Sequence, residues 1–568
     1  MMPLSARVLL RRYVRRFGSK KTVASDLKAG LVLGVESVPD GLAAGLLAGV
    51  NPLFGLYGYL MGTLGGALAT GSVFMTVQVT GAMAVVIADV PLIQTGPLVG
   101  AALATLAIMT GIVMLVLGIL KLGSLVRFIP TAVLVGFINA VAISIVLGQL
   151  DNFTGYDSEG ANRIIRAIDT LFHLFEFSWP SLLVGIITIV LILALERTAL
   201  GALAMVVAIV ATSALAALLN ALVAHQPVAL LSGIAEVPNA LPGVSLPDAS
   251  LILPLILPAL SLALVGLVQG AAISGSIANP SGRFPDPSAD FRGQGVANIA
   301  AGMFQGMPVG GSMSATALVR AAGAKSALAN LVAAAIMALT IVLLGSVIGY
   351  IAMPALAGLL ILVGVRTFKL HDVLMVWRTG PIQIAVLTVT FVLTLLIPLQ
   401  YAVLTGVGLA IILHIARQSN RVTVKQWVFE PGNALPSETA PPAAVAPGDI
   451  VVLVPYGSLF FAAAPVFEAQ LPTVPVVAKR AVVIVRLRGK DELGSTFIRV
   501  LAQYASRLRG AGGSLMLAGV NKKVYEQLTV TGVLATIGPE NVFVEEPRVG
   551  RALTSAIQKA ERWVAESE

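Results

Sequence analysis

The stretch Pro308-Val309-Gly310-Gly311-Ser312-Met313-Ser314-Ala315-Thr316 decides the fold class of this chain. It lies between two long apolar runs, and its proline, glycines and small polar residues cannot continue a hydrophobic membrane helix. Irregular backbone at membrane depth is tolerated only where it is buried in protein or lines a water-filled cavity. The stretch therefore predicts a broken span. Its helical half begins near Gly311 and directs unpaired N–H groups and a positive dipole end into a polar site.

The composition places this site in a membrane protein. The chain has 568 residues, of which 57% are hydrophobic and 11% are charged, whereas soluble domains are about 25% charged. Residues 1–26 form a basic segment typical of a cytoplasmic tail that contacts lipid headgroups. The N-terminal tail supplies most of the net charge of +9, which argues against nucleic-acid binding. The chain contains no cysteine, which excludes disulfides and thiolate metal sites.

Apolar runs of about 20 residues predict roughly fourteen spans or part-spans between residues 27 and 417. We place these spans at 28–50, 53–70, 72–89, 98–120, 128–150, 179–196, 200–223, 251–278, 293–306, 311–320, 326–349, 351–366, 379–397 and 400–416. With the N-terminus inside, most Lys and Arg between spans fall on the cytoplasmic side, as the positive-inside rule requires. The exceptions are Arg163 and Arg166, which lie in an acidic outer loop. We therefore expect a multi-pass protein of the cell membrane, with both termini in the cytoplasm.

Two of these spans are too short to cross the bilayer, and each is third in a series of seven. The first begins with a β-type run, Val73–Val79, after which Thr80 and Gly81 open a helix; the second is the stretch quoted above. Matched discontinuous spans are the pattern of an inverted repeat whose half-helices meet at the midplane and bind anionic substrate groups. The alternative is that the small residues merely allow close helix packing.

A soluble domain is predicted after the membrane region. A proline- and alanine-rich linker over 418–448 precedes alternating short strands and helices over 449–568. This alternation predicts a small cytoplasmic α/β domain.

Several of these stretches resemble the sulfate permease (SulP) family of anion transporters, which carry a C-terminal STAS domain. The resembling segments are 38–57, 122–139, 147–150, 308–316, 322–325, 491–495, 519–524 and 541–543. The resemblance implies a seven-plus-seven inverted-repeat helical membrane protein with core and gate modules, a STAS-like domain, a homodimer, and a small inorganic or organic anion as substrate. Sulfate, bicarbonate, chloride and small dicarboxylates all remain open as that substrate.

The chain departs from the family pattern at the site itself. Where many members carry an arginine at the start of the tenth span, this chain has Ala315. Gln269 replaces a carboxylate of the eighth span, and Ile273 stands where sodium-coupled members have a hydroxyl. The third-span helix start has Gln78-Val79 in place of a Gly-Pro pair. Because two oxygen ligands are lost, these departures predict transport without sodium.

Two carboxylates distinguish the first span. Glu36 and Asp40 are four residues apart, and they share a helix face if the helix persists past Pro39. Carboxylates inside a membrane are costly, and their default interpretation is functional, often as proton relays. We therefore take both as candidates for proton coupling, with Asp40 preferred because it is closer to an expected helix break at Pro39. In the alternative, Glu36 pairs with a polar group and Asp40 caps a broken helix end.

The predicted substrate site consists of two facing half-helix starts and one amide from the eighth span. Its residues are Gln78, Thr80, Gly81, Gln269, Gly311, Ser312 and Ser314. The four histidines are scattered and no nucleophile–base set is apparent, so we expect no metal, no cofactor and no enzymatic activity. Two alternatives stay open, namely a channel-like pore of the same fold and a carrier of uncharged, nucleobase-like substrates.

Overall fold

The computed structural model describes most of the chain, in two compact units, Met1–Gly408 and Leu409–Glu568. The residues described are 16–19, 21–94, 98–123, 129–160, 162–198, 200–222, 227–234, 237–397, 399–419, 422–430, 435–457, 459 and 461–565. Each unit is considered by itself below.

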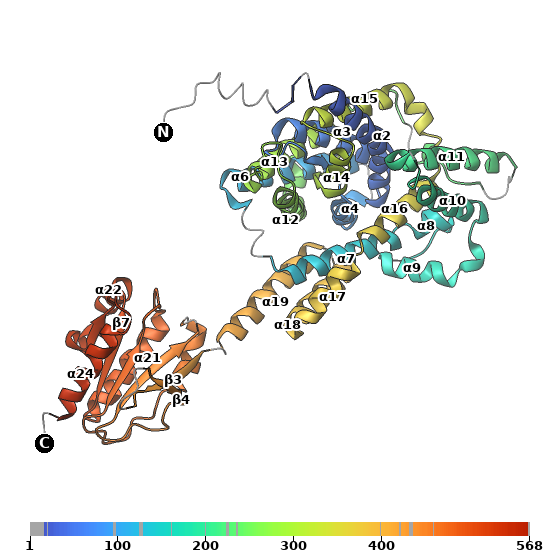
Figure 1. Ribbon diagram of the computed structural model, residues 1–568. Helices are drawn as coiled ribbons and strands as arrows, with labels where there is room; N and C mark the ends of the chain where they lie inside the picture. The colour runs from blue at the N-terminus through green and yellow to red at the C-terminus, as the bar shows by residue number, and fades with distance from the viewer. Residues whose placement is uncertain are drawn as a thin grey trace. The chain divides into compact units, whose positions relative to one another are not determined.

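The first unit is helical (Figure 1), and its two halves repeat the same order of long and short helices. The main helices of the first half are α2 (Val23–Leu47), α3 (Pro52–Ala69), α4 (Gly81–Ala88), α6 (Val99–Ile119), α7 (Thr131–Leu147), α10 (Trp179–Leu195) and α11 (Ala204–Leu222). Those of the second half are α12 (Ile252–Ser276), α13 (Pro287–Met303), α14 (Met313–Ala321), α15 (Leu328–Ile348), α16 (Met353–Thr367), α18 (Pro381–Leu396) and α19 (Leu399–Ser419), the last of which crosses the boundary between the units at Gly408. The third helix in each series is the short one, with 8 residues in α4 and 9 in α14, as the sequence predicted.

Shorter elements connect these helices. They are α5 (Pro91–Gln94), α8 (Leu150–Thr154), α9 (Arg163–Phe172) and α17 (Leu370–Thr379), together with the strands β1 (Thr76–Gln78) and β2 (Gly310–Ser312). Among the described helices, 6 are long and apolar enough to cross a bilayer outright, and α10 and α18 are shorter apolar helices.

The helices of the first unit pack as two bundles. The core bundle consists of α2, α3, α4, α6, α12, α13, α14 and α15, and α13 packs along both α3 and α6. The gate bundle consists of α7, α8, α10, α11, α16, α17 and α18, and α9 packs on α7 and α8. In Figure 1, α10 and α11 lie side by side, with α16 close to α10. Contacts between the bundles run through α4 with α7 and through α2 with α11 and α16.

The expected helix break at Pro39 is not present. α2 runs without interruption from Val23 to Leu47 with Pro39 inside it. A proline removes one backbone hydrogen bond, but membrane helices tolerate this because neighbouring groups satisfy the freed carbonyl. Asp40 therefore does not cap a broken helix end, and it lies one turn beyond Glu36 on the same helix face.

The second unit contains one mixed sheet with the strand order β4-β3-β5-β6-β7-β8. The strands are β3 (Thr423–Val428), β4 (Ser437–Thr439), β5 (Ile450–Tyr456), β6 (Val482–Arg486), β7 (Ser514–Val520) and β8 (Val542–Val544). The helices are α20 (Ala464–Glu468), α21 (Ser495–Gly510), α22 (Lys522–Val530), α23 (Val533–Ile537) and α24 (Arg551–Ala565). Phe467 and Phe497 pack on one face of the sheet, and Leu553 and Ala556 of α24 pack on the other. This is the α/β domain that the sequence predicted.

The segment 418–448 is not simply a linker. It contributes β3 and β4, and β3 pairs antiparallel with β5 from Thr423 opposite Tyr456 to Trp427 opposite Val452. Val424 is buried in this sheet. The prolines of the segment predicted irregular chain, but they lie outside these two strands, so they do not interrupt the ladder.

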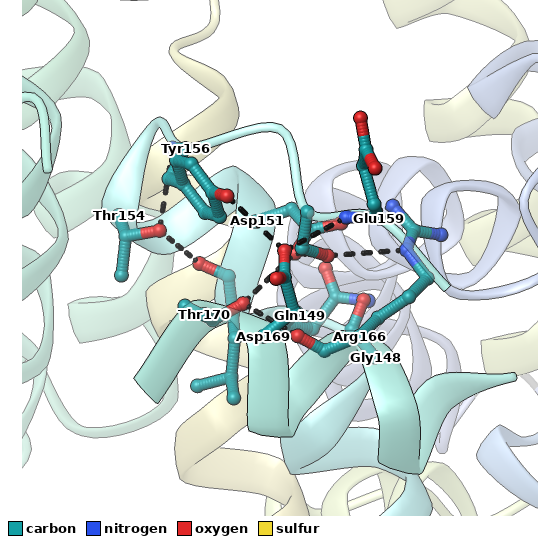
Figure 2. A network of polar contacts seen from close by, with 11 residues as sticks. Gly148, Gln149, Asp151, Thr154, Tyr156, Glu159, Arg166, Asp169 and Thr170 are labelled. Atoms are coloured by element: carbon teal, nitrogen blue, oxygen red, sulfur yellow. Dashed lines mark hydrogen bonds and ion pairs between the residues drawn. The ribbon is translucent and has the colours of Figure 1, made fainter. Parts of the chain in front are cut away.

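A polar network organises the connection between α8 and α9 (Figure 2). Asp151 accepts a hydrogen bond from Ser158 at 2.6 Å and forms an ion pair with Arg166. Asp169 accepts from the Tyr156 hydroxyl at 3.1 Å and from the Glu159 backbone N–H at 2.9 Å. The acidic loop is therefore held by its own basic and hydroxyl groups.

His173 follows α9 as its C-cap residue and contacts the acidic loop. Its Nδ1 atom lies 2.9 Å from the Asp169 carbonyl oxygen, and its ring stacks on Tyr156 with the centroids 5.2 Å apart. The hydrogen bond to the Asp169 backbone, aided by nearby carboxylates, raises the pKa of His173 above 6.5. Since the folded-state pKa is the higher one, protonated His173 stabilises the loop fully below the unfolded value, and this stabilisation is lost as the pH rises through the folded value.

We therefore expect the amides of α9 to exchange more slowly at about pH 6 than at about pH 8, once the intrinsic exchange rates have been corrected for. Hydrogen exchange read by mass spectrometry measures this difference, and the His173→Gln variant should lose it. Equal protection at both pH values in the parent protein would show that His173 does not stabilise the loop.

Candidate functional site

The two unwound segments of the core bundle pair with each other. β1 and β2 are antiparallel, with Thr76 opposite Ser312 and Gln78 opposite Gly310. α4 begins three residues after β1, and α14 begins directly after β2. The pairing therefore brings the N-terminal ends of both half-helices to one crossing.

Each half-helix begins with a hydroxyl cap. Thr80 Oγ1 accepts from the Met83 N–H, and Ser312 Oγ accepts from the Ala315 N–H, both at 3.3 Å. A cap satisfies one of the N–H groups that have no partner in the first turn of a helix. The remaining N–H groups and the positive dipole ends can attract negative charge at the crossing.

Polar side chains from three elements surround these helix starts. Gln269 of α12 accepts through Oε1 from the Thr80 hydroxyl at 3.0 Å, which leaves its amide nitrogen as a further donor. The hydroxyl oxygens of Ser312 and Ser314 lie 3.2 Å apart, and Ser314 is exposed. The structure thus brings Thr80 and Gln269 together, and likewise Ser312 and Ser314.

Three other predicted site residues serve different contacts. Gln78 is buried and donates through Nε2 to the Ser37 hydroxyl of α2 at 2.8 Å. The Gly311 N–H donates to Gln294 Oε1 at 3.0 Å, so it is not available to a ligand. Gly81 lies at the contact between the bundles, where an added Cβ would come within 2.9 Å of Ile145 Cδ1.

Helix α13 supplies amides that the sequence analysis missed. Asn298 donates to the Val309 carbonyl at 2.6 Å and accepts from the Val309 N–H at 2.8 Å. Gln294, one turn earlier, binds Gly311. Gln294 and Asn298 are four residues apart and continue a spacing that begins at Asp290, so three buried polar groups share one face of α13. This spacing is a signal that could have been recognised, because such groups must find partners inside the membrane.

Polar groups at the start of β1 and just before it are satisfied in the same way. The Thr76 hydroxyl donates to Asn330 Oδ1 at 2.9 Å, and the Thr76 N–H donates to the Thr316 hydroxyl at 3.1 Å. Asp290 accepts from the Ser72 N–H and from the Ser274 hydroxyl, each at 2.6 Å. These bonds explain how unwound backbone persists at membrane depth.

The carboxylates of α2 lie on the helix that packs against both half-helices. Glu36 and Asp40 are half-buried, and Asp40 Oδ2 accepts from the Tyr59 hydroxyl of α3 at 3.0 Å. Glu36 precedes Ser37, which holds Gln78 of β1. The two acidic groups therefore lie on an element in contact with the site.

The two segments that form this crossing contain no basic side chain. Neither Lys nor Arg occurs in residues 29–120 or 293–319, and Arg320 lies exposed in the last turn of α14. Among the described residues, no group of three or more His, Asp and Glu could hold a metal ion. Within residues 29–120 and 293–319, only helix dipoles and neutral donors can stabilise negative charge.

Comparison with known proteins agrees with this architecture. Residues 23–390 match the model of the sulfate permease family, and residues 441–546 match the STAS domain. The putative sulfate transporter YvdB of Bacillus subtilis is 27% identical over 531 residues, covering 91% of this chain and 95% of YvdB. The bicarbonate transporter BicA of Picosynechococcus sp. is 28% identical over 410 residues, covering 70% of this chain and 71% of BicA.

A solved structure has the same fold along nearly the whole chain. The murine Solute Carrier 26 family member A9 anion transporter in the inward-facing state superposes with a TM-score of 0.84 at 19% identity, and the match covers 99% of this chain and 96% of that one. The chain therefore belongs to the sulfate permease family of multi-pass membrane transporters, which are not enzymes, and it carries a STAS domain.

Proposed function

We propose that this chain is a secondary active transporter that carries a small anion across the plasma membrane, independently of sodium and in a manner linked to pH. The observation that supports this most directly is the β1–β2 pairing, which joins two half-helix N-termini. Donors that remain beside them come from the Gln269 amide nitrogen and from the hydroxyl pair Ser312 and Ser314, while the Thr80 hydroxyl orients Gln269. Backbone N–H groups and neutral side-chain donors suit oxyanions or halides. Sulfate, bicarbonate, chloride and small dicarboxylates are the candidate substrates.

The absence of hard oxygen ligands supports the proposed independence of sodium. Gln269 contributes a neutral amide whose oxygen already accepts from Thr80. Ile273, one turn further along α12, is fully buried and contributes only carbon. A hard cation needs several oxygen ligands, and neither of these two positions supplies a free one.

The test is uptake by the purified protein in liposomes. Labelled sulfate, bicarbonate, chloride and a small dicarboxylate are offered in turn, under imposed proton or sodium gradients. We expect saturable uptake of at least one anion, driven by a pH gradient and unaffected by a sodium gradient. Flux that does not saturate would favour a pore, and a requirement for sodium would contradict the coupling scheme.

Topology and assembly are further parts of the proposal. Both termini should lie in the cytoplasm, since the basic residues between spans then fall inside. The protein should form a homodimer, as the family resemblance implies. Protease protection in sealed vesicles and the mass of the detergent-solubilised protein measure these two properties.

Removal of the Ser314 hydroxyl should weaken anion binding moderately. The Ser314→Ala variant loses one neutral donor next to Ser312, which costs about 1 kcal/mol, or roughly a fivefold rise in Kd. Titration calorimetry or the concentration dependence of uptake measures the change. Ser276→Ala is the matched control, because Ser276 is also exposed but bonds only the carbonyls of its own helix. Equal affinities in the two variants would remove Ser314 from the site.

A further inference from the structure

One arginine connects the two bundles of the membrane unit. Arg163 is the first residue of α9, which packs on α7 and α8 of the gate bundle. Its Nη2 atom lies 3.0 Å from Asp89 Oδ1 and donates to the Val85 carbonyl at 3.1 Å. Val85 and Asp89 belong to the C-terminal end of α4, an element of the core bundle.

The position at the end of α4 makes this contact favourable. Asp89 is the C-cap of α4, where the last carbonyls have no partner within the helix and the dipole end is negative. The guanidinium binds both a carbonyl and a carboxylate there. The side chains of Arg163 and Asp89 are only 22% and 28% exposed, so water screens this ion pair less than it screens a surface pair.

Arg163 is itself held by the gate side. Asn162 caps α9 by accepting from the Ile165 N–H at 3.0 Å. One turn further on, Arg166 binds Asp151 within the network of Figure 2. The aliphatic part of Arg163 lies over Gly148, where an added Cβ would be 3.5 Å from Arg163 Cδ. A displacement of the gate bundle therefore carries the guanidinium with it.

The other end of α4 is the candidate anion site. A transporter of this architecture exposes its site alternately to the two sides of the membrane by moving one bundle against the other. A bond of about 3 Å between two moving bodies persists in only one of the two states. The contact between Arg163 and the end of α4 therefore forms in one position of α4 relative to the gate bundle, and it stabilises that position.

We propose that Arg163 is a latch: it holds the C-terminal end of α4 against the gate bundle in the state seen here and releases in every transport cycle. This inference rests on the proposed function as an alternating-access anion transporter. It assigns to the outer-loop helix α9 a role in setting the balance between the two states.

The absence of cysteine from the chain allows a direct test. Asp89→Cys and Arg163→Cys are introduced together and bridged with a short bifunctional thiol reagent in liposomes. Uptake is measured with whichever anion of the panel the parent protein accumulates. We expect a crosslink, detected by mass spectrometry, that abolishes uptake, and we expect uptake to return when the bridge is reduced.

The matched control is the pair Asp151→Cys and Arg166→Cys, which replaces an ion pair confined to the gate side. Its crosslink should form and leave uptake unchanged. A second latch pair, Ala88→Cys with Ile164→Cys, keeps both charged residues and guards against misfolding of the first pair. We expect it to behave like the first.

The outcomes separate the latch from the proposed function. Uptake by a protein bridged between α4 and α9 would show that these elements move together and would overturn the latch. Failure of both latch pairs to crosslink in folded protein would show that the contact does not form, with the same consequence. A parent protein that takes up no anion would instead overturn the proposed function, and the latch would fall with it.

Discussion

Replacement of Gly311 by leucine should abolish transport. Gly311 of β2 is fully enclosed, and an added Cβ would lie 3.0 Å from Ile273 Cδ1 and 3.4 Å from the Gly270 Cα. A leucine must push β2 away from α12, at a cost of about 1–3 kcal/mol for overpacking. This shift would displace the start of α14 and break the bond from the Gly311 N–H to Gln294. Liposome uptake together with the thermal stability of the purified variant measures both effects.

The control for this substitution is Gly275→Leu. Gly275 lies on α12, the helix that Gly311 of β2 packs against. Gly275 is exposed, and an added Cβ there meets no atom within 4 Å. We expect this variant to fold and transport normally. If Gly311→Leu also transported normally, the close β2–α12 contact would not support the anion site, and the site would have to lie elsewhere.

The Asp40→Asn variant should transport with a flat pH profile. Asp40 and Glu36 lie one turn apart on the uninterrupted α2, so two negative charges there repel each other and also repel an anion at the neighbouring crossing. Protonation of one carboxylate relieves this repulsion, which links proton uptake to anion uptake. An asparagine mimics the protonated group and can still accept from Tyr59. Anion binding should persist, while the dependence of uptake on pH should be lost.

Initial uptake rates between about pH 5 and about pH 8 measure this effect. Glu36→Gln should flatten the profile as well, since carboxylates this close share their proton as a pair. Asp157→Asn, an exposed change in the α8–α9 connection, is the control and should keep the parent profile. If Asp40→Asn and Glu36→Gln both kept the full pH response, α2 would not be the coupling element.

The sequence by itself determined the class of the protein and the place of its breaks. Apolar runs, two short spans in matching positions, and glycine and hydroxyl residues within 80–81 and 310–314 were enough to predict a repeated helical membrane domain with two half-helices. The change to alternating strands and helices predicted the soluble domain. These features can be recognised from sequence because hydrophobic periodicity and glycine or proline content are visible in short stretches of neighbouring residues.

Only the tertiary structure decided which donors remain for a ligand. The sequence predicted Gln78 and Gly311 as site residues. In the structure, the Gln78 amide nitrogen donates to Ser37 and the Gly311 N–H donates to Gln294. Pro39 predicted a break in the first helix, yet α2 continues through it. The choice of hydrogen-bond partner depends on segments far apart in the chain, such as Arg163 reaching Asp89. A local sequence pattern shows that a polar group inside a membrane needs a hydrogen-bond partner. The packing of helices that are distant in the sequence determines which residue is that partner.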